Sequence, residues 1–313
     1  MTKDPDDTDE IPVPTEPEKL SPAGESSRVE VELAALSHPG KVRTNNEDHY
    51  LVARFDRSMR TIESNLREGE VPRQYAETAY AMLVADGVGG AAGGEIASRT
   101  AVHALVDLVI ETPDWIMRLD RPLANEVLQR MERRFQQVRT VLMERAKAEP
   151  ALRGMATTMT VAATLGPELL TAHVGDSRAY VYRRGGKLER LTRDQTLAQS
   201  LADAGAISEW EIDTHPSRNV LTSALATRGA FVQVELKHAH LADGDQLLLC
   251  SDGLTDMVSE DVISRELSAS SSPAAKCQRL VDLALENGGK DNVTVVLGRW
   301  RIPPDLKIRP HTH

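Results

Sequence analysis

The sequence predicts an α+β domain with mainly antiparallel sheets and segregated helices. Several segments of strand length are joined by tight turns such as GPE and GDS, which is typical of hairpins. Two long segments instead have apolar residues at helical spacing. The expected elements come in the order strands, two helices, strands, helices and one strand. Because strands do not alternate singly with helices, this order favours α+β over a βαβ fold.

The strands are predicted from alternating or continuous apolar residues. Residues 29–38 alternate apolar and polar side chains, as in a half-buried strand, whereas residues 245–252 contain a continuous apolar segment. Between the second and third expected strands lies a charged connection, residues 56–79, which is long for a loop inside a compact domain. The expected strands are residues 29–38, 49–55, 80–86, 157–165, 168–174, 178–184, 231–236, 245–252 and 291–300.

The helices are predicted from periodicity and from their end signals. In residues 123–148 a stripe of apolar side chains recurs every three or four positions, with charged residues on the far side. Ser259 and Ser272 are expected N-caps, and Gly205 lies just past an expected helix end. The expected helices are residues 94–112, 123–148, 195–205, 259–267 and 272–289.

The chain ends and the composition limit the possible classes of protein. Residues 1–28 contain five prolines and many acidic residues, so we expect a disordered tail; residues 303–313 are expected to form a short C-terminal tail. The formal net charge of −10 disfavours nucleic acid or an anionic membrane as the main partner. No membrane-length apolar segment or signal peptide is evident. The two cysteines, Cys250 and Cys277, show no sign of pairing, which is typical of proteins in a reducing compartment. We therefore expect a cytoplasmic protein.

Four aspartates stand where expected strands begin or end, each beside Gly, Ser or Asn. If these strands share one sheet edge, the carboxylates form an acidic cluster that requires cations. Carboxylate oxygens without convergent His or Cys favour Mg²⁺ or Mn²⁺ over Zn²⁺ or copper. His49 and His173 flank these segments, but we expect local hydrogen bonds for them, since no two histidines show a metal-ligand spacing. The four aspartates are Asp86, Asp176, Asp252 and Asp291.

Further residues fit chemistry at phosphorus. Two divalent ions about 4 Å apart can clamp both ends of a displacement at phosphorus and provide hydroxide near neutral pH. Asp86 is the candidate bridging ligand, because Gly87 allows a backbone carbonyl to approach a metal. Arg43 supplies the planar fork that suits a phosphate. Glu47 and Asp48 are suited to holding metal-bound waters.

The chain resembles the bacterial PPM-type metal-dependent serine/threonine protein phosphatases, which are similar to phosphatase 2C. The resemblance extends from about residue 28 to residue 300, so we expect one phosphatase domain over residues 29–302. It is carried by RTNNED, ADGVGGAAGGEIAS, TTMTVAATL, VGDSRAYVYR, LTRDQT, CSDGLTDMV and KDNVTVVL, in that order.

The resemblance implies two stacked, mainly antiparallel sheets flanked by helix pairs, and hydrolysis of phosphoserine and phosphothreonine by a metal-activated water. Two core Mn²⁺ or Mg²⁺ ions are implied, with a third ion at Asp176. The substrates are phosphoproteins, and a Ser/Thr kinase is the expected counterpart of a monomeric enzyme. The implied site residues are Asp86, the Gly87 carbonyl, Asp252, Asp291 and Asp176 for metal, Arg43 for phosphate, and Glu47 and Asp48 for water.

The sequence departs from the family pattern at two positions where relatives carry His. The segment after Asp86-Gly87 contains Ala91 and Ala92, and Gln195 follows Asp194. Two other functions therefore stay open: a pseudo-phosphatase that binds a phosphopeptide or partner without turnover, and a phosphohydrolase of small molecules.

Overall fold

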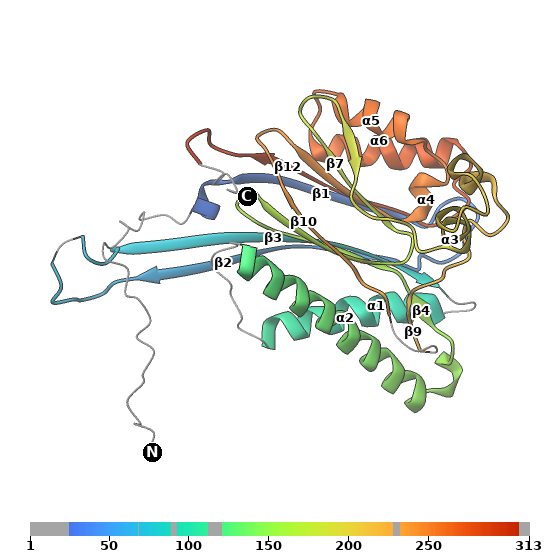
Figure 1. The fold of residues 1–313 in the computed structure, drawn as a ribbon, viewed down its shortest axis with the longest axis horizontal. Coiled ribbons are helices and arrows are strands. Elements are labelled where there is room, and N and C mark those ends of the chain that lie inside the picture. Colours follow the sequence, from blue (N-terminus) through green and yellow to red (C-terminus); the bar gives the residue numbers. More distant parts are fainter. Residues whose placement is uncertain (1–24, 68, 89–92, 112–120, 228–231, 307–313) are drawn as a thin grey trace, which may run out of the picture.

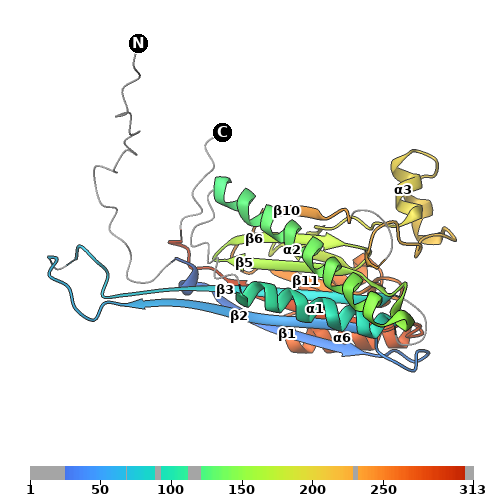
Figure 2. The same cartoon turned by 90° about the horizontal axis from the view of Figure 1, so that it is seen from below.

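The computed structural model describes residues 25–67, 69–88, 93–111, 121–227 and 232–306. They form two antiparallel sheets stacked face to face, with helices on both outer faces (Figure 1). The predicted α+β class and the stacked arrangement are confirmed. Figure 2 shows α1 and α2 lying along the same face of one sheet.

The five-stranded sheet has the order β1-β12-β11-β7-β8, and the larger sheet has the order β10-β6-β5-β3-β4-β9 with β2 paired to β3. Among the described residues all paired strands are antiparallel, as the hairpin-rich sequence predicts. The strands are β1 (Glu30–His38), β2 (Asp48–Arg60), β3 (Gln74–Val88), β4 (Ala156–Thr157), β5 (Met159–Leu165), β6 (Glu168–Val174), β7 (Arg178–Tyr182), β8 (Leu188–Arg190), β9 (Leu225–Ala226), β10 (Glu235–His240), β11 (Gln246–Cys250) and β12 (Val293–Arg301).

Two helices cover each sheet on its outer face, with short helical segments between. On α2 the predicted apolar stripe is buried from Met131 through Phe135 to Leu142. Ser272 caps α6 by accepting from the Ala275 N–H, and Gly205 follows α3 with a positive φ, as predicted. The helices are α1 (Gly93–Glu111), α2 (Arg121–Ala148), α3 (Leu197–Asp203), α4 (Asp252–Thr255), α5 (Glu260–Ser268) and α6 (Pro273–Glu286), with 3-10 turns η1 (Glu25–Arg28), η2 (Pro150–Leu152) and η3 (Glu209–Thr214).

Three apolar clusters join the layers. The central cluster lies between the sheets and contains Trp300, Leu249 and Met82. The second joins α1 and α2 to the larger sheet around Phe135, and the third joins α5 and α6 to the smaller sheet around Leu280. Because burial of apolar area is the main favourable term in folding, these clusters fix the sheets against each other and so position the strand ends.

Three sequence predictions of element boundaries are wrong. The long connection over residues 56–79 is strand at both of its ends: β2 continues to Arg60 and β3 begins at Gln74, and the two pair as a ribbon. Cross-strand pairing stabilises these polar segments, which have no clear apolar period. The strand expected at 231–236 instead occupies Glu235–His240, and residues 178–190 form a hairpin of two strands rather than one.

Parts of both expected tails belong to the folded domain. Ser26 lies within the predicted N-terminal tail, yet it is buried and its Oγ accepts from the Thr78 N–H at 3.1 Å. Leu306 is buried in the central cluster, and Arg28 pairs with Asp305 at 2.6 Å. The predicted disorder of residues 1–24 lies outside the described residues.

Candidate active site

The predicted acidic residues meet at one end of the stacked sheets, opposite the tip of the β2–β3 ribbon (Figure 1). Asp48 begins β2 and lies directly across from Asp86 of β3. Asp252 begins α4 just after β11, and Asp291 precedes β12. Asp176 follows β6 after Gly175, whose φ of 112° suits a turn that a larger residue would strain. Separate strands thus bring the carboxylates to one place.

Burial raises the pKa of these carboxyls. The pKa of Asp86 and of Asp252 is well above the ordinary value, first because of desolvation and then because of neighbouring carboxylates. Desolvation also raises the pKa of Asp48 to about 6, and that of Asp176 to about 7 with the charge of Asp194 as the next cause. Raised carboxyl pKa values are expected where like charges are buried together, and they are common at functional sites.

Hydrogen bonds fix the backbone around Asp86 and Gly87. The Asp86 N–H donates to Thr158 Oγ1 at 3.0 Å, and the Asp86 carbonyl accepts from Thr157 Oγ1 at 2.8 Å. A Cβ on Gly87 would lie 2.2 Å from the Gly94 carbonyl oxygen, so a larger residue would push α1 away. The glycine after Asp86 is therefore needed for close packing of β3 against the start of α1.

Asp48 is held by a residue that sequence reasoning did not identify as important. Ser251 is buried and donates to Asp48 Oδ2 at 2.7 Å, while its Oγ also accepts from the Thr294 N–H at 2.9 Å. Asp48 Oδ1 is buried and has no hydrogen-bond partner among the described residues. Oδ1 is therefore a buried acceptor that a water molecule can satisfy.

Asn292 is a second residue of the site whose role the sequence alone did not indicate. Its side-chain oxygen accepts from the Glu47 N–H at 2.7 Å, and its amide donates to the carbonyls of Pro39 and Asn45. It therefore attaches the segment that carries Arg43 and Glu47 to the start of β12. Asp-Asn before a strand is usually a turn signal, so the sequence alone did not reveal this role.

Arg43 and Glu47 lie at the edge of the cluster. Arg43 is exposed, and its Nη2 donates to Asp291 Oδ2 at 2.6 Å. Desolvation raises the pKa of the half-buried Glu47, against the lowering effect of Arg43. The Arg43 guanidinium thus lies on the solvent side of the carboxylates, where an anion can reach it.

Of the two positions where the sequence departs from the family pattern, the structure describes only the one at Gln195. Gln195 has structural partners: its Oε1 accepts from the Gly175 N–H and its Nε2 donates to the Gln233 carbonyl. Asp194 is ion-paired with Arg178 and Arg190. Ala91 and Ala92 lie outside the described residues. His173 and His49 make the predicted local hydrogen bonds, to Thr160 and Ser98.

The donor set fits hard divalent ions. It consists of carboxylate oxygens and a closely packed glycine backbone, with raised pKa values that a cation would reverse. The residues that would hold ions are Asp86, the Gly87 carbonyl, Asp252, Asp291 and Asp176. In the part of the chain that the structure describes, no helix is long and apolar enough to cross a membrane.

The stacked sheets and the acidic site are together those expected of a metal-dependent phosphatase. A family model described as "Protein phosphatase 2C" matches residues 72–286. The chain belongs to the protein phosphatase 2C family.

The chain is 35% identical over 265 residues to serine/threonine protein phosphatase PstP of Mycobacterium tuberculosis, covering 84% of this chain and 44% of that protein. The chain therefore spans less than half the length of this relative. It is 33% identical to protein phosphatase PhpP of Streptococcus pneumoniae, covering 85% of this chain and 96% of PhpP. A crystal structure of the PstP catalytic domain in complex with two manganese ions aligns with a TM-score of 0.67 at 32% identity, over 87% of this chain and 99% of that one.

Proposed function

We propose that this protein is a metal-dependent serine/threonine phosphoprotein phosphatase. The observation that carries the proposal is the group of carboxylates on separate strands whose pKa values are raised by burial and mutual repulsion. Such a site is unfavourable for the protein alone and becomes favourable when it binds cations. Manganese in the PstP catalytic domain supports Mn²⁺ or Mg²⁺ as the cofactor here.

In this proposal Asp86, the Gly87 carbonyl, Asp252 and Asp291 would hold two core ions, with Asp86 as the ligand shared between them. Asp176 and Asp252 hold a third. When bound, such ions would lower the pKa of a water so that hydroxide is available near neutral pH, and they would neutralise charge on the phosphate.

The chain's own residues supply binding and orientation. Arg43 binds the phosphate of the substrate, and its exposed guanidinium exchanges Asp291 for phosphate oxygens. Asp48, fixed by Ser251, presents Oδ1 as an acceptor for a proton of the attacking water. Glu47, fixed through Asn292, accepts a second hydrogen bond from water. Because these groups are held before substrate arrives, less ordering is needed at the moment of reaction.

The partners follow from this chemistry. The substrates are proteins that carry phosphoserine or phosphothreonine, and a Ser/Thr kinase is the counterpart in signalling. We place the enzyme in the cytoplasm as a monomer; the two buried free cysteines, Cys250 and Cys277, are compatible with a reducing compartment.

The test is phosphate release from a phosphothreonine peptide with Mn²⁺, with Mg²⁺ and with EDTA, beside Asp252→Asn. Asp261→Asn is the matched control, because Asp261 is an exposed aspartate in the first turn of α5. Activity that requires both metal and Asp252, and that survives in the control, supports the proposal.

No release by folded, metal-loaded protein would contradict it and favour a phosphopeptide-binding pseudo-phosphatase. Turnover of small phosphate esters far above that of phosphopeptides would instead favour a small-molecule phosphohydrolase.

A further inference from the structure

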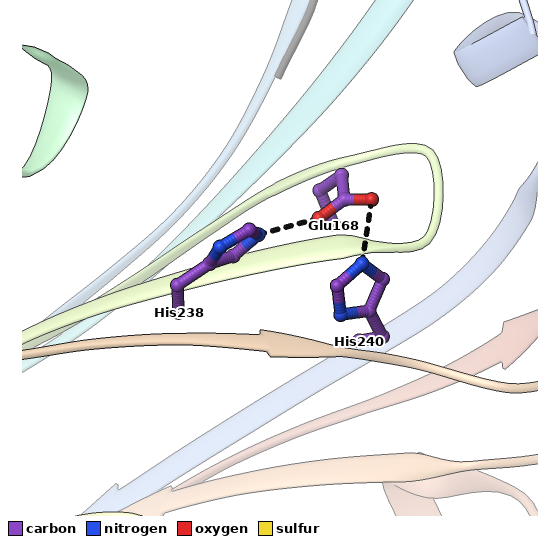
Figure 3. A group of neighbouring side chains, drawn as sticks. All are labelled: Glu168, His238 and His240. Carbon is purple, nitrogen blue, oxygen red and sulfur yellow. Dashed lines mark hydrogen bonds and ion pairs between the residues drawn. The ribbon is translucent and has the colours of Figure 1, made fainter. Parts of the chain in front are cut away.

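A second group of metal-ligand side chains lies far from the acidic site. Glu168 begins β6, whereas Asp176 follows the other end of the same strand. The seven residues from Glu168 to Val174 span about 20 Å at the rise of a strand. Figure 3 shows Glu168 between the rings of His238 and His240. Our prediction that no two histidines show a metal-ligand spacing is therefore wrong for His238 and His240.

The strand register explains the convergence. His238 and His240 are two residues apart on β10, so both side chains lie on the same face of the strand. Glu168 lies directly opposite His240 in the register and diagonally opposite His238. The sequence prediction missed the pair because it ended this strand at residue 236, before either histidine.

The three side chains already point at one another. His238 Nε2 lies 2.5 Å from Glu168 Oε2, and His240 Nε2 lies 3.0 Å from Glu168 Oε1. The two imidazole centroids are 5.1 Å apart. Among the described residues, this is the one group of three His, Cys, Asp or Glu side chains whose ligand atoms all lie within 4.8 Å of one another.

These dimensions suit a small d-block ion. A tetrahedral zinc ion with bonds of about 2.0–2.1 Å holds its ligand atoms about 3.4 Å from each other. Small rotations of the three side chains would meet that spacing. Two imidazoles and a carboxylate are a ligand set that Zn²⁺ accepts, leaving a fourth position for water. Mg²⁺ and Mn²⁺ prefer the hard oxygens of the acidic site.

The surroundings allow entry and hold the ligands in place. The side chains of His238, Glu168 and His240 are 20%, 18% and 27% exposed, so an ion and a water can reach them. The backbone of β10 is fixed at this end, because Arg183 Nη1 donates to the His240 carbonyl at 2.8 Å and the Leu241 N–H donates to the Pro167 carbonyl at 2.8 Å. A fixed backbone reduces the ordering needed for metal binding.

We propose that Glu168, His238 and His240 form a zinc-binding site, independent of the acidic site, that joins edge strand β10 to β6. β10 is the terminal strand of the larger sheet, paired only with β6 in the sheet order. An ion held from both strands links them beyond their backbone hydrogen bonds, so zinc is expected to raise the unfolding temperature of the folded chain.

The experiment is zinc titration by calorimetry on the untagged full chain, with thermal unfolding measured beside it. His311 and His313 are replaced by Ala throughout, because they form a second His-x-His sequence near the end of the chain. The test variant is His240→Gln. The matched control is His103→Gln, which removes an exposed histidine that also faces a carboxylate, Asp107, at 3.0 Å.

We expect one zinc to bind the His103→Gln control and to raise its unfolding temperature by a few degrees. In His240→Gln the affinity should fall at least about tenfold and the rise in temperature should disappear. Asp252→Asn should retain the zinc event. X-ray absorption of the zinc-loaded chain should show two imidazole ligands.

Equal zinc affinity in His240→Gln and in the control would overturn the proposal. So would loss of the zinc event in Asp252→Asn, or an absorption spectrum with oxygen ligands only, because both would assign the zinc to the acidic site. If His240→Gln does not fold, Glu168→Gln and the absorption spectrum give the same decision.

Discussion

An aspartate lies at each end of β11, and the two aspartates differ in the groups that surround their carboxylates. Asp245 precedes the strand and is 1% exposed. It accepts from Arg183 Nη1 at 2.8 Å and from the N–H groups of Arg184 and Ala242. Asp252 follows the strand and has carboxylates as its electrostatic neighbours, among them Asp176 and Asp291.

The difference separates structural from functional carboxylates. A buried carboxylate costs several kcal/mol unless charge and hydrogen bonds compensate it. Asp245 is compensated within the protein and stabilises the turn before β11. The charge of Asp252 is compensated only when a ligand binds. Asp252 therefore stabilises the folded state less than Asp245 does, but its carboxylate stays available to a metal ion. The same contrast holds for Asp194, whose pKa burial alone would raise but which Arg178 and Arg190 hold below the ordinary value.

The largest expected effect is on catalysis at the acidic end. Asp86→Asn should lower kcat/KM on a phosphothreonine peptide by at least ~1000-fold, or about 4 kcal/mol, because it removes the ligand proposed to be shared by the two core ions. In EDTA the folded state of this variant should be no less stable than that of wild type, because one of several mutually repelling carboxylates is gone. Steady-state kinetics and urea unfolding test both parts. Loss of folding in EDTA would show that Asp86 is structural.

At the other end of β11 the opposite outcome is expected. Asp245→Asn should lower the free energy of unfolding by about 3 kcal/mol, because it leaves Arg183 without its buried partner. The kcat of the protein that remains folded should be unchanged. Urea unfolding and active-fraction kinetics at low temperature measure these effects; a loss of kcat without loss of stability would break the comparison.

The pH dependence of the metal-free protein sharpens the comparison further. Burial raises the pKa of Asp176 to about 7, from an ordinary value of 3.8. Between these values the folded chain holds a proton that the unfolded chain has lost, so this group's contribution to stability falls as pH rises from about 4 to about 7.

Wild type and Asp176→Asn should therefore be compared by urea unfolding in EDTA at pH 5 and pH 7. The variant should gain stability relative to wild type at pH 7, by roughly 2 kcal/mol, and less at pH 5. Saturating Mn²⁺ should remove that gain. A gain that is larger at pH 5 than at pH 7 would have the wrong sign.

Two neighbouring glycines test how tightly the acidic end is packed. A Cβ on Gly94 would lie 2.6 Å from Glu47 Oε2 and 2.7 Å from the Gly87 carbonyl oxygen. Among the described residues, a Cβ on Gly93 would meet Met155 Cβ alone, at 3.7 Å. Gly94→Ala should therefore lower kcat/KM by about 10- to 100-fold, equivalent to ~1.4–2.7 kcal/mol, while Gly93→Ala changes little. Equal activities would mean that the site tolerates movement of the carbonyl.

The smallest effect is expected at the rim. Arg43→Lys should raise KM for a phosphopeptide about tenfold with a smaller change in kcat, because Lys keeps the charge but loses the planar fork. Lys41→Arg, an exposed neighbour in the same loop, serves as the control. An unchanged KM in Arg43→Lys would mean that Arg43 does not contact phosphate.

The sequence by itself determined the elements with strong periodicity and the acidic residues at strand ends. Apolar spacing identified α1, α2, β5, β6 and β11, and turn residues located most hairpins. These patterns are local, because each residue's face in a strand or helix depends on its own neighbours. The family resemblance added the roles of the aspartates.

Only the tertiary structure decided which residues meet across distant segments. Asn292 joins the Glu47 segment to β12, and Ser251 holds Asp48, although 245 and 203 residues separate the two pairs. The continuation of β2 and β3 past the apolar part, and the placement of Glu168 between His238 and His240, both follow from strand register. Register depends on which strands pair and in what alignment, and that is fixed by packing of the whole sheet rather than by either strand alone.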